Sequence, residues 1–153
     1  MGYLLRWDVG GLEARVGYGV QPYAVSIAAL AGAPDCDALE VLCQREGSWL
    51  PNTAFMPIRL EYLETVSAEQ LRAGISQRWT ISAVVFSGPP VAIPEPDDFP
   101  VIGHLTLDEV EVALAQHREL LPEASEPSPA VEEFTGWLDA CRRSGRDLVC
   151  FYY

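Results

Sequence analysis

The last six residues of the chain, Leu148-Val-Cys-Phe-Tyr-Tyr153, form an uninterrupted run of apolar and aromatic side chains. Valine, phenylalanine and tyrosine favour strands, and a run without polar alternation is typical of a strand that is buried on both faces. Gly145 precedes the run, and glycine commonly ends a helix. The sequence therefore predicts a helix that ends near Gly145 and leads into a buried strand of a central sheet.

The clearest helix start lies at residues 105–110, where Thr106 can act as the N-cap and Glu109 as its capping-box partner. This pattern predicts a helix over residues 107–121. A later start signal, a serine followed by Pro129, opens the last helix, because proline is well suited to the first helical turn. The second half of the chain is thus expected to hold two long helices before the terminal strand.

The remaining elements are expected from composition and from the spacing of apolar residues. They are a strand at 2–9, a short helix at 12–16, a short or edge strand within 18–25, helices at 27–31, 38–46 and 57–66, a short helix around Leu71, and a strand at 79–86. The last of these alternates before becoming wholly apolar, so it is the clearest internal strand of the prediction.

Together these elements predict one α+β domain over residues 1–153, with a small central sheet that includes the C-terminal strand and several packed helices. No apolar run approaches the roughly 20 residues of a membrane span. The N-terminus has no long apolar stretch with a small-residue cleavage site, as a secretory signal would. We therefore expect a soluble, cytoplasmic protein that does not bind membranes.

Negative charge is concentrated in one part of the chain. The whole sequence has a formal charge of −12, and residues 95–139 hold twelve acidic residues against Arg118 alone, a net charge of −11. Such a segment repels nucleic acid and attracts basic proteins. The alternative interpretation is a solvated face that keeps the protein in solution.

No residue pattern indicates a metal site, a cofactor or a catalytic centre. The four cysteines have no zinc spacing and suit buried free thiols. A nucleophilic pair of Cys150 with His104 stays open, because proximity in space is invisible in a sequence. Asp97 and Asp98, with Glu95 nearby, offer oxygen ligands for a hard cation, but neighbouring side chains on an extended segment point apart, which favours a solvated turn.

Nucleotide-binding and hydrolase signatures are absent from the sequence. Without any lysine the chain cannot contain a P-loop, and it has no complete dinucleotide-binding glycine pattern and no G-x-S-x-G nucleophile elbow. Its basic residues form no patch beyond Arg142, Arg143 and Arg146, which suit the C-terminal end of a helix. We therefore expect no nucleic-acid partner.

Three stretches together resemble a known family. They are Leu-Cys-Gln-Arg-Glu-Gly-Ser-Trp-Leu-Pro-Asn at 42–52, Gly-Pro-Pro-Val-Ala-Ile-Pro-Glu-Pro-Asp-Asp-Phe-Pro-Val-Ile-Gly-His-Leu-Thr at 88–106, and Gly-Arg-Asp-Leu-Val-Cys-Phe-Tyr-Tyr at 145–153. The chain resembles an uncharacterised actinobacterial-type family, a domain of unknown function, over most of residues 38–153. Its element order is also similar to that of YfbM-like bacterial proteins. The resemblance implies a cytosolic bacterial α+β domain and no activity, and His104 stands where such families usually have a tyrosine-like residue.

The leading functional hypothesis is a non-enzymatic module that binds a basic protein through its acidic segment, as an immunity protein or an antitoxin does. The partner-binding residues predicted from the sequence are Asp97, Asp98, Phe99, His104, Glu109, Glu111 and Trp49.

Two alternatives stay open beside this hypothesis. One is a small-molecule-binding domain or small enzyme whose pocket lies between the loop at 97–104 and the aromatic loop at 49–55. The other is a structural role in a homodimer. Exposed aromatic residues in these loops would mark a partner site, whereas buried ones would line the core.

Overall fold

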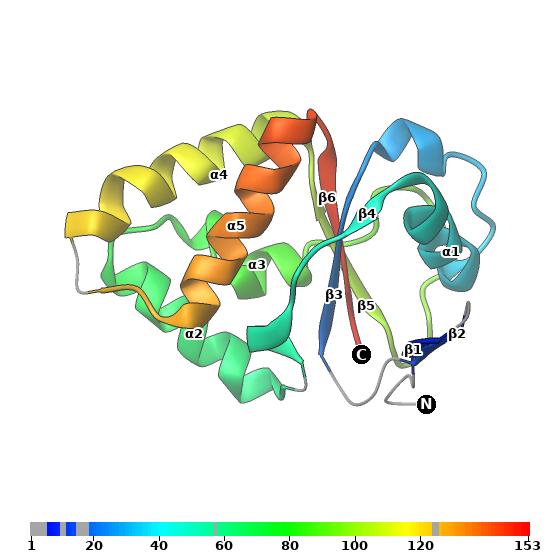
Figure 1. Ribbon diagram of the computed structural model, residues 1–153, viewed down its shortest axis with the longest axis horizontal. Helices are drawn as coiled ribbons and strands as arrows, with labels where there is room; N and C mark the ends of the chain where they lie inside the picture. Colours follow the sequence, from blue (N-terminus) through cyan, green and yellow to red (C-terminus); the bar gives the residue numbers. More distant parts are fainter. Residues whose placement is uncertain (1–5, 10–11, 15–18, 57, 124–125) are drawn as a thin grey trace.

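The computed structural model describes residues 6–9, 12–14, 19–56, 58–123 and 126–153. Within them the chain forms five α-helices and a four-stranded antiparallel sheet that includes the C-terminal strand, which confirms the α+β class (Figure 1). The order of strands across the sheet is β4 (Ser48–Trp49), β3 (Val20–Val25), β6 (Asp147–Tyr152) and β5 (Val101–Leu105).

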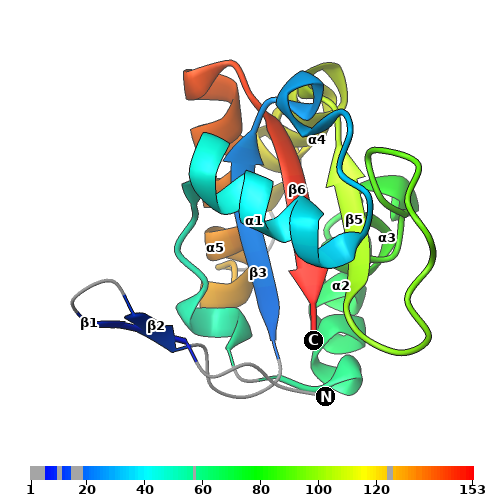
Figure 2. The same cartoon turned by 90° about the vertical axis from the view of Figure 1, so that its right-hand side faces the viewer.

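Helices cover both faces of this sheet. They are α1 (Cys36–Glu46), α2 (Leu60–Arg72), α3 (Ile81–Val85), α4 (Leu107–Leu120) and α5 (Pro129–Ser144), with 3-10 turns η1 (Ile27–Leu30), η2 (Thr53–Phe55), η3 (Gln77–Trp79) and η4 (Leu121–Glu123). Helix α1 and η1 lie on one face, and α2 to α5 lie on the other (Figure 2). Strands β1 (Arg6–Val9) and β2 (Leu12–Ala14) form a separate two-stranded sheet.

The predicted terminal strand is confirmed as β6, which pairs with β3 on one side and β5 on the other. Its side chains alternate between two hydrophobic clusters. Leu148 and Cys150 lie under α2 to α5, whereas Val149 and Phe151 lie under α1. All four are fully buried, because each face of the strand is covered by helices.

The predicted helix starts in the second half of the chain are also confirmed. Thr106 accepts a hydrogen bond from the Glu109 amide while the Glu109 carboxylate accepts one from the Thr106 amide, and α4 follows. Ser128 caps α5, which begins at Pro129. The helix ends at Gly145, whose φ of 67° is the left-handed conformation that glycine adopts at little cost.

The Asp147 carboxylate joins the two layers of helices, a role that the sequence analysis missed. Its Oδ2 accepts the Ile27 amide at 2.8 Å, at the start of η1. Its Oδ1 accepts the Leu107 amide at 2.7 Å, at the start of α4. One side chain at the beginning of β6 therefore satisfies an amide on each side of the sheet.

The predicted strand at 79–86 is wrong, because these residues form η3 and α3. Thr80 is the N-cap of α3. The buried members Ile81, Val84 and Val85 have the i, i+3, i+4 spacing of a helix, although their side chains favour strands. Packing against the sheet therefore overrides the intrinsic strand preference here.

Three other predictions in the first half of the chain need correction. The predicted helix at 12–16 is wrong in the part that the structure describes, since Leu12–Ala14 is strand β2 paired with β1. The strand predicted at 2–9 is confirmed over Arg6–Val9. Residues 2–5 of that prediction and residues 15–16 of the predicted helix lie outside the described residues. The predicted helices at 57–66 and around Leu71 are one helix, α2, which begins at Leu60 and not at 57, a position that lies outside the described residues. Ser67 lies inside this helix, and its hydroxyl donates a hydrogen bond to the Ser82 hydroxyl at 2.8 Å.

Strand β3 is internal, although Pro22 led to the prediction of a short or edge strand. The Pro22 backbone faces away from β6, and its carbonyl accepts the Leu50 amide at 2.9 Å. Because the Pro22 backbone points toward the β4 side, the amide that proline lacks is not one that would bond to β6. Strand β4 pairs with β3 at Tyr23 and Ala24, so it does not need this amide either. Strand β5 was not predicted, because the prolines before it indicate an extended loop.

A buried histidine supports the packing of α2 against α4. His117 Nδ1 donates to the Ala113 carbonyl at 2.7 Å, so its Nε2 is the acceptor for Gln70 Nε2 at 3.0 Å. Gln70 Oε1 in turn accepts the Ile81 amide at 2.9 Å. Burial lowers the pKa of His117 below its ordinary value, partly offset by the bond to Ala113.

Stability is therefore expected to fall in mild acid through His117. Unfolded chains take up the proton near the ordinary pKa of about 6.5, but the folded protein does so only at lower pH, so the stabilisation is present above pH 6.5 and is lost as the pH falls below it. The slope is at most about 1.4 kcal/mol per pH unit. Urea unfolding between pH 5 and 8 should show a smaller slope for His117→Gln than for wild type. A wild-type slope in His117→Gln would contradict this prediction.

Candidate functional site

The segment that follows α3 closes the outer edge of the sheet. The Gly88 amide donates to the Ile102 carbonyl at 3.0 Å. Ser87 Oγ accepts the His104 amide at 2.9 Å, and His104 Nδ1 donates to the Gly88 carbonyl at 2.8 Å. The outward backbone groups of β5 are thus largely occupied by two residues of the same chain, as is usual for protected edge strands.

A pocket of about 390 Å³ lies beside this closed edge. The lining residues are Phe86, Gly88, Pro89, Ile93, Pro94, Glu95, Pro96, Asp98, Pro100, Val101 and Ile102. The strand supplies one wall and the proline-rich segment 89–100 supplies the other. Apolar walls with a few polar groups are the usual composition of a ligand pocket.

The only charged side chains that line this pocket among the described residues are Glu95 and Asp98. Both residues are exposed, and Asp97 is exposed beside them. The pocket therefore combines an apolar interior with a negative rim, and no described basic side chain lines it.

Three aromatic rings meet where this pocket joins the end of the sheet. The rings of Phe99 and Phe86 each pack edge-on against Tyr152, with centroid distances of 6.1 and 6.0 Å. Phe86 keeps 45% of its surface exposed. Burial and the nearby Glu61 carboxylate raise the pKa of Tyr152, so this tyrosine is neutral at physiological pH.

The structure brings four of the seven predicted partner-binding residues into one region. Asp97, Asp98 and Phe99 lie in the segment beside the pocket, and Asp98 lines it. Phe99 also packs against both hydrophobic clusters. His104 does not line the pocket but fixes the Gly88 carbonyl at its edge. Its role there is to hold the backbone that shapes the pocket.

Glu109 is engaged elsewhere. Its carboxylate forms an ion pair with Arg78 in addition to its capping bonds to Thr106. Burial acts to raise the pKa of Glu109, but the bonds from Thr106 and Arg78 outweigh it and lower the pKa. This side chain is therefore a helix cap.

Glu111 and Trp49 lie away from the pocket. Glu111 borders a separate depression of about 370 Å³ that Arg118 and Arg142 also line. Trp49, which is 46% exposed, lies on β4 at the opposite edge of the sheet from β5. No residue of 49–55 lines the pocket. The alternative hypothesis placed a small-molecule pocket between the loop at 97–104 and the loop at 49–55, but these two loops do not share this pocket.

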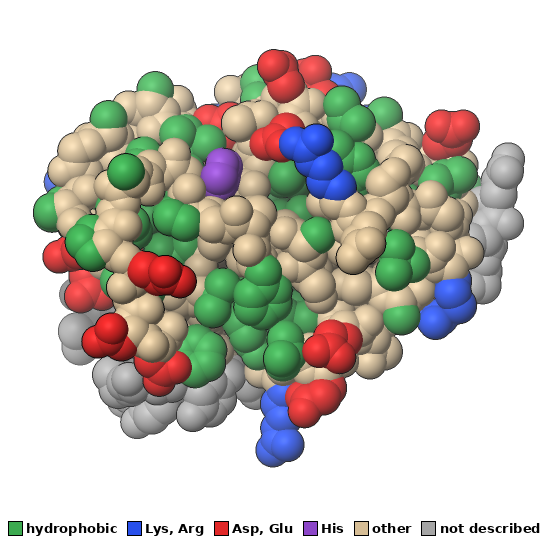
Figure 3. All heavy atoms as spheres, turned by 180° about the vertical axis from the view of Figure 1, so that it is seen from behind, with side chains coloured by type: hydrophobic (Ala, Val, Ile, Leu, Met, Phe, Trp, Pro, Cys, Tyr) green, Lys and Arg blue, Asp and Glu red, His purple; other side chains and the backbone are tan. Residues whose placement is uncertain are grey.

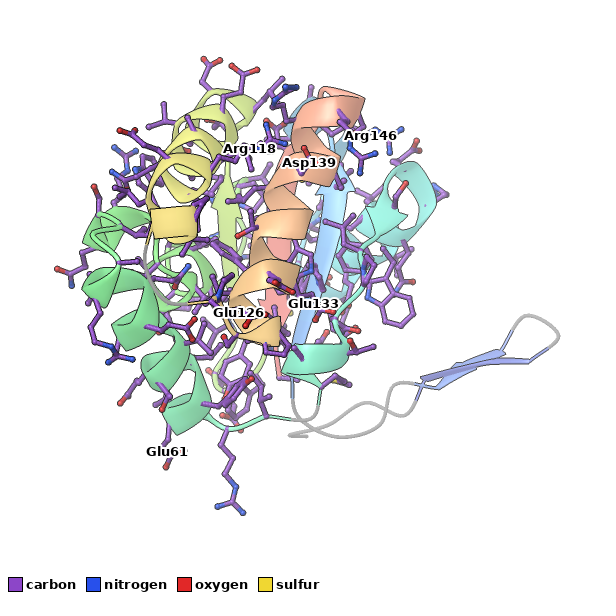
Figure 4. The ribbon with its side chains drawn as sticks, turned by 60° about the vertical axis from the view of Figure 1, so that its left-hand side comes forward. Glu61, Arg118, Glu126, Glu133, Asp139 and Arg146 are labelled. Atoms are coloured by element: carbon purple, nitrogen blue, oxygen red, sulfur yellow. The ribbon has the colours of Figure 1, made fainter. Side chains whose placement is uncertain are left out.

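Several side chains of the acidic segment are engaged in contacts within the protein. Asp139 of α5 pairs with Arg118 of α4 (Figure 4). It also pairs with Arg143, one turn later in α5. Glu133 accepts hydrogen bonds from Thr53 Oγ1 and the Ala54 amide, both at 2.9 Å. Within this segment Glu109 and Asp139 are thus paired with arginines, whereas Glu95, Asp97 and Asp98 form no ion pair with another described residue.

The cysteines are free thiols, as predicted, and three of them are buried. Burial raises the pKa of Cys43 and Cys141 to about 12, and raises that of Cys150 further. These thiols stay protonated and are poor nucleophiles. Cys150 lies in the cluster under α2 to α5, whereas Ile102, two residues before His104 on the same face of β5, lies in the other cluster. The two members of the Cys150–His104 pair therefore point to opposite faces of the sheet.

The sequence analysis missed Phe86, Ile93 and Tyr152 as site residues. Phe86 was assigned to the end of a buried strand, and Tyr152 to the core. The available signal was the helical spacing before Phe86, which would have placed this residue at the end of a short helix. Within the described residues, no group of three or more histidine, cysteine or acidic residues is arranged to hold a metal ion.

In the part of the chain that the structure describes, no helix has the length and apolar character needed to cross a membrane. Comparisons with curated proteins and with solved structures find no match. A family model described as a domain of unknown function, DUF7691, matches residues 31–153, in agreement with the resemblance noted in the sequence. On the strength of this match over most of its length, the chain belongs to the family of proteins that contain the domain of unknown function DUF7691.

Proposed function

We propose that this protein is a binding module that docks a basic segment of a partner protein at the pocket beside β5. The observation that supports the proposal is the lining of this pocket: apolar walls with Glu95 and Asp98 as the charged side chains. The partner class is the one expected from the sequence, a basic protein bound in the manner of an immunity protein or an antitoxin. The bacterial origin, the cytoplasmic location and the similarity to YfbM-like proteins stay predictions.

An arginine or lysine side chain has the matching chemistry. Its aliphatic stem can lie against Ile93, Pro96 and Val101 while its charged end reaches the carboxylates at the rim. Charge-assisted hydrogen bonds to a carboxylate are stronger than neutral ones. The negative field around Asp97 and Asp98 would also speed the encounter with a basic partner at low salt.

The partner is not expected to add a strand to the sheet. Strand addition needs free amides and carbonyls along an edge, but Ser87 and Gly88 already bond to Ile102 and His104. Recognition therefore depends on side chains in the pocket. Enzyme chemistry is not favoured by the lining, which offers carboxylates but no thiol, histidine or hydroxyl nucleophile among the described residues.

A peptide that contains one arginine between apolar residues is expected to bind, and its citrulline counterpart, which has the same shape without the charge, is expected to bind much more weakly. The double variant Glu95→Gln/Asp98→Asn should weaken the arginine peptide roughly tenfold, since two charge-assisted contacts are lost. Fluorescence anisotropy at 50 and 300 mM salt would measure the affinity of the arginine and citrulline peptides for the wild type and for the double variant.

The double variant Glu111→Gln/Glu119→Gln is the matched control, because it also removes two acidic charges from exposed positions, and neither residue lines the pocket. Its affinity should stay within about twofold of wild type. Equal affinity for the arginine and citrulline peptides, or equal losses in this control and in the pocket variant, would contradict the proposal and point to a nonspecific effect of net charge.

A further inference from the structure

The pocket beside β5 is rich in hydrogen-bond acceptors and poor in donors. Four prolines line it, Pro89, Pro94, Pro96 and Pro100. Each proline contributes a carbonyl but no N–H group. The polar side chains that line the pocket among the described residues are those of Glu95 and Asp98, which accept hydrogen bonds when ionised and donate none. The Gly88 amide is already bonded to the Ile102 carbonyl. A ligand that brings its own donors is therefore matched to this lining.

The ring of Phe86 lines the same pocket, and the residue keeps 45% of its surface exposed. Its backbone is fixed on both sides. The Phe86 amide bonds to the Ser82 carbonyl at 3.0 Å, and the next residue, Ser87, donates its hydroxyl to the Val84 carbonyl at 2.8 Å. The ring also packs edge-on against Tyr152, with the centroids 6.0 Å apart. Phe86 thus presents a partly exposed ring in a fixed position, which lowers the cost of ordering it when a ligand binds.

Exposure near acidic side chains does not by itself mark a site. Figure 3 shows hydrophobic and acidic side chains next to one another on the face opposite that of Figure 1. Other large apolar residues, such as Leu60 and Leu71, are exposed to a similar extent as Phe86. Phe86 differs from them because it shares a pocket with two carboxylates, and because the lining of that pocket offers few donors.

Arginine and lysine side chains differ in the properties that this lining favours. The arginine guanidinium is planar, holds several N–H donors in a rigid fork and stacks on aromatic rings. The lysine ammonium is a compact and strongly hydrated point charge. A guanidinium can lie on the Phe86 ring and still donate in its own plane to Glu95 or Asp98. Lysine would satisfy the carboxylates but would gain less from the ring.

Resting on the proposed function, we propose that the basic residue recognised in the partner protein is arginine in preference to lysine, and that Phe86 makes the distinction. The guanidinium plane lies on the exposed ring of Phe86, and its N–H groups donate to the carboxylates of Glu95 and Asp98. Because the carboxylates attract either basic side chain, the preference for arginine comes from the ring.

Two peptides that differ only in an arginine or a lysine between apolar residues test this proposal by fluorescence anisotropy. Wild type should bind the arginine peptide about fivefold more tightly, the size expected for cation–π stacking at an exposed site. Phe86→Leu keeps an apolar side chain without a ring, and should reduce this ratio to about twofold or less by weakening the arginine peptide. Phe86→Tyr keeps a ring and should keep the wild-type ratio. Neither variant should change Tm much, because the position is exposed.

The stacked geometry also has a signature that does not depend on affinity. In a peptide labelled with carbon-13 in the arginine side chain, the protons next to the guanidinium should shift upfield on binding to wild type, because they lie over an aromatic ring. The shift should be lost with Phe86→Leu. Tyr62→Leu is the matched control, since it also removes a partly exposed ring but at a separate depression. It should change neither the shift nor the affinity ratio.

The outcomes separate this inference from the proposed function. If the arginine and lysine peptides bind equally well and both depend on Glu95 and Asp98, the preference is overturned and the proposed function stands. An arginine preference that is the same in Phe86→Leu as in wild type would overturn the role of the ring. If the arginine peptide binds no better than its citrulline counterpart, both proposals are overturned.

Discussion

Removal of residues 151–153 is expected to abolish the folded state. Phe151 is fully buried, and Tyr152 and Tyr153 each keep only 7% of their surface exposed. Truncation of one buried phenylalanine to alanine typically costs about 3–5 kcal/mol. The loss of three large aromatic side chains therefore matches or exceeds a typical total stability of about 5–15 kcal/mol. Far-UV circular dichroism and thermal unfolding of the shortened chain would measure the result.

The matched control for this truncation is Phe151→Leu. It keeps the strand and most of the buried volume, so the expected cost is about 1–1.5 kcal/mol and the protein should remain folded. A truncated chain with the Tm of wild type would show that β6 does not hold the sheet together, although it pairs with both β3 and β5.

Gly103→Ala is expected to destabilise the protein by about 1–3 kcal/mol, the usual range for overpacking. A Cβ atom at Gly103 would lie 1.9 Å from the Val84 carbonyl oxygen and 2.5 Å from that of Val85. Both are backbone atoms of α3, so a side chain cannot rotate away and the helix must move. Because α3 leads directly into Phe86, the same variant should also weaken arginine-peptide binding at the pocket.

Gly136→Ala is the opposite case and serves as the control. It lies within α5, and a Cβ atom there would have no neighbour within 4 Å. Alanine in a helix interior is favoured over glycine by roughly 0.5–1 kcal/mol, so this variant should be more stable than wild type. Urea unfolding compares the two. Equal stability of Gly103→Ala and wild type would mean that α3 does not pack closely on β5.

Local signals predicted the elements that depend on neighbouring residues. The capping box at Thr106 and Glu109, the proline at the start of α5 and the apolar run of β6 each define their element without help from distant parts of the chain. Residues 81–85 show the limit of this approach. Their β-branched composition favours a strand, but the Gln70 side chain accepts the Ile81 amide and a helix forms in that place.

The candidate site was predictable only in part, for a physical reason. Asp97, Asp98 and Phe99 attracted attention through charge and proline content, which are visible in sequence. The opposite wall comes from Val101 and Ile102 in a strand that was not predicted, and Tyr152 reaches the site only through the pairing of β6 with β5. A count of charges also cannot show which acidic residues form ion pairs. The packing of the helices decides that Glu109 pairs with Arg78 and that Asp139 pairs with Arg118.

The double hydrogen bond of Asp147 has a consequence for how the protein opens. One carboxylate accepts an amide from η1 on one face of the sheet and from α4 on the other. Detaching either layer leaves the same charged group with half of its partners, so the loss on one side weakens the attachment on the other. The two layers are therefore thermodynamically coupled through a single residue and behave as one cooperative unit, not as two helices that fray independently.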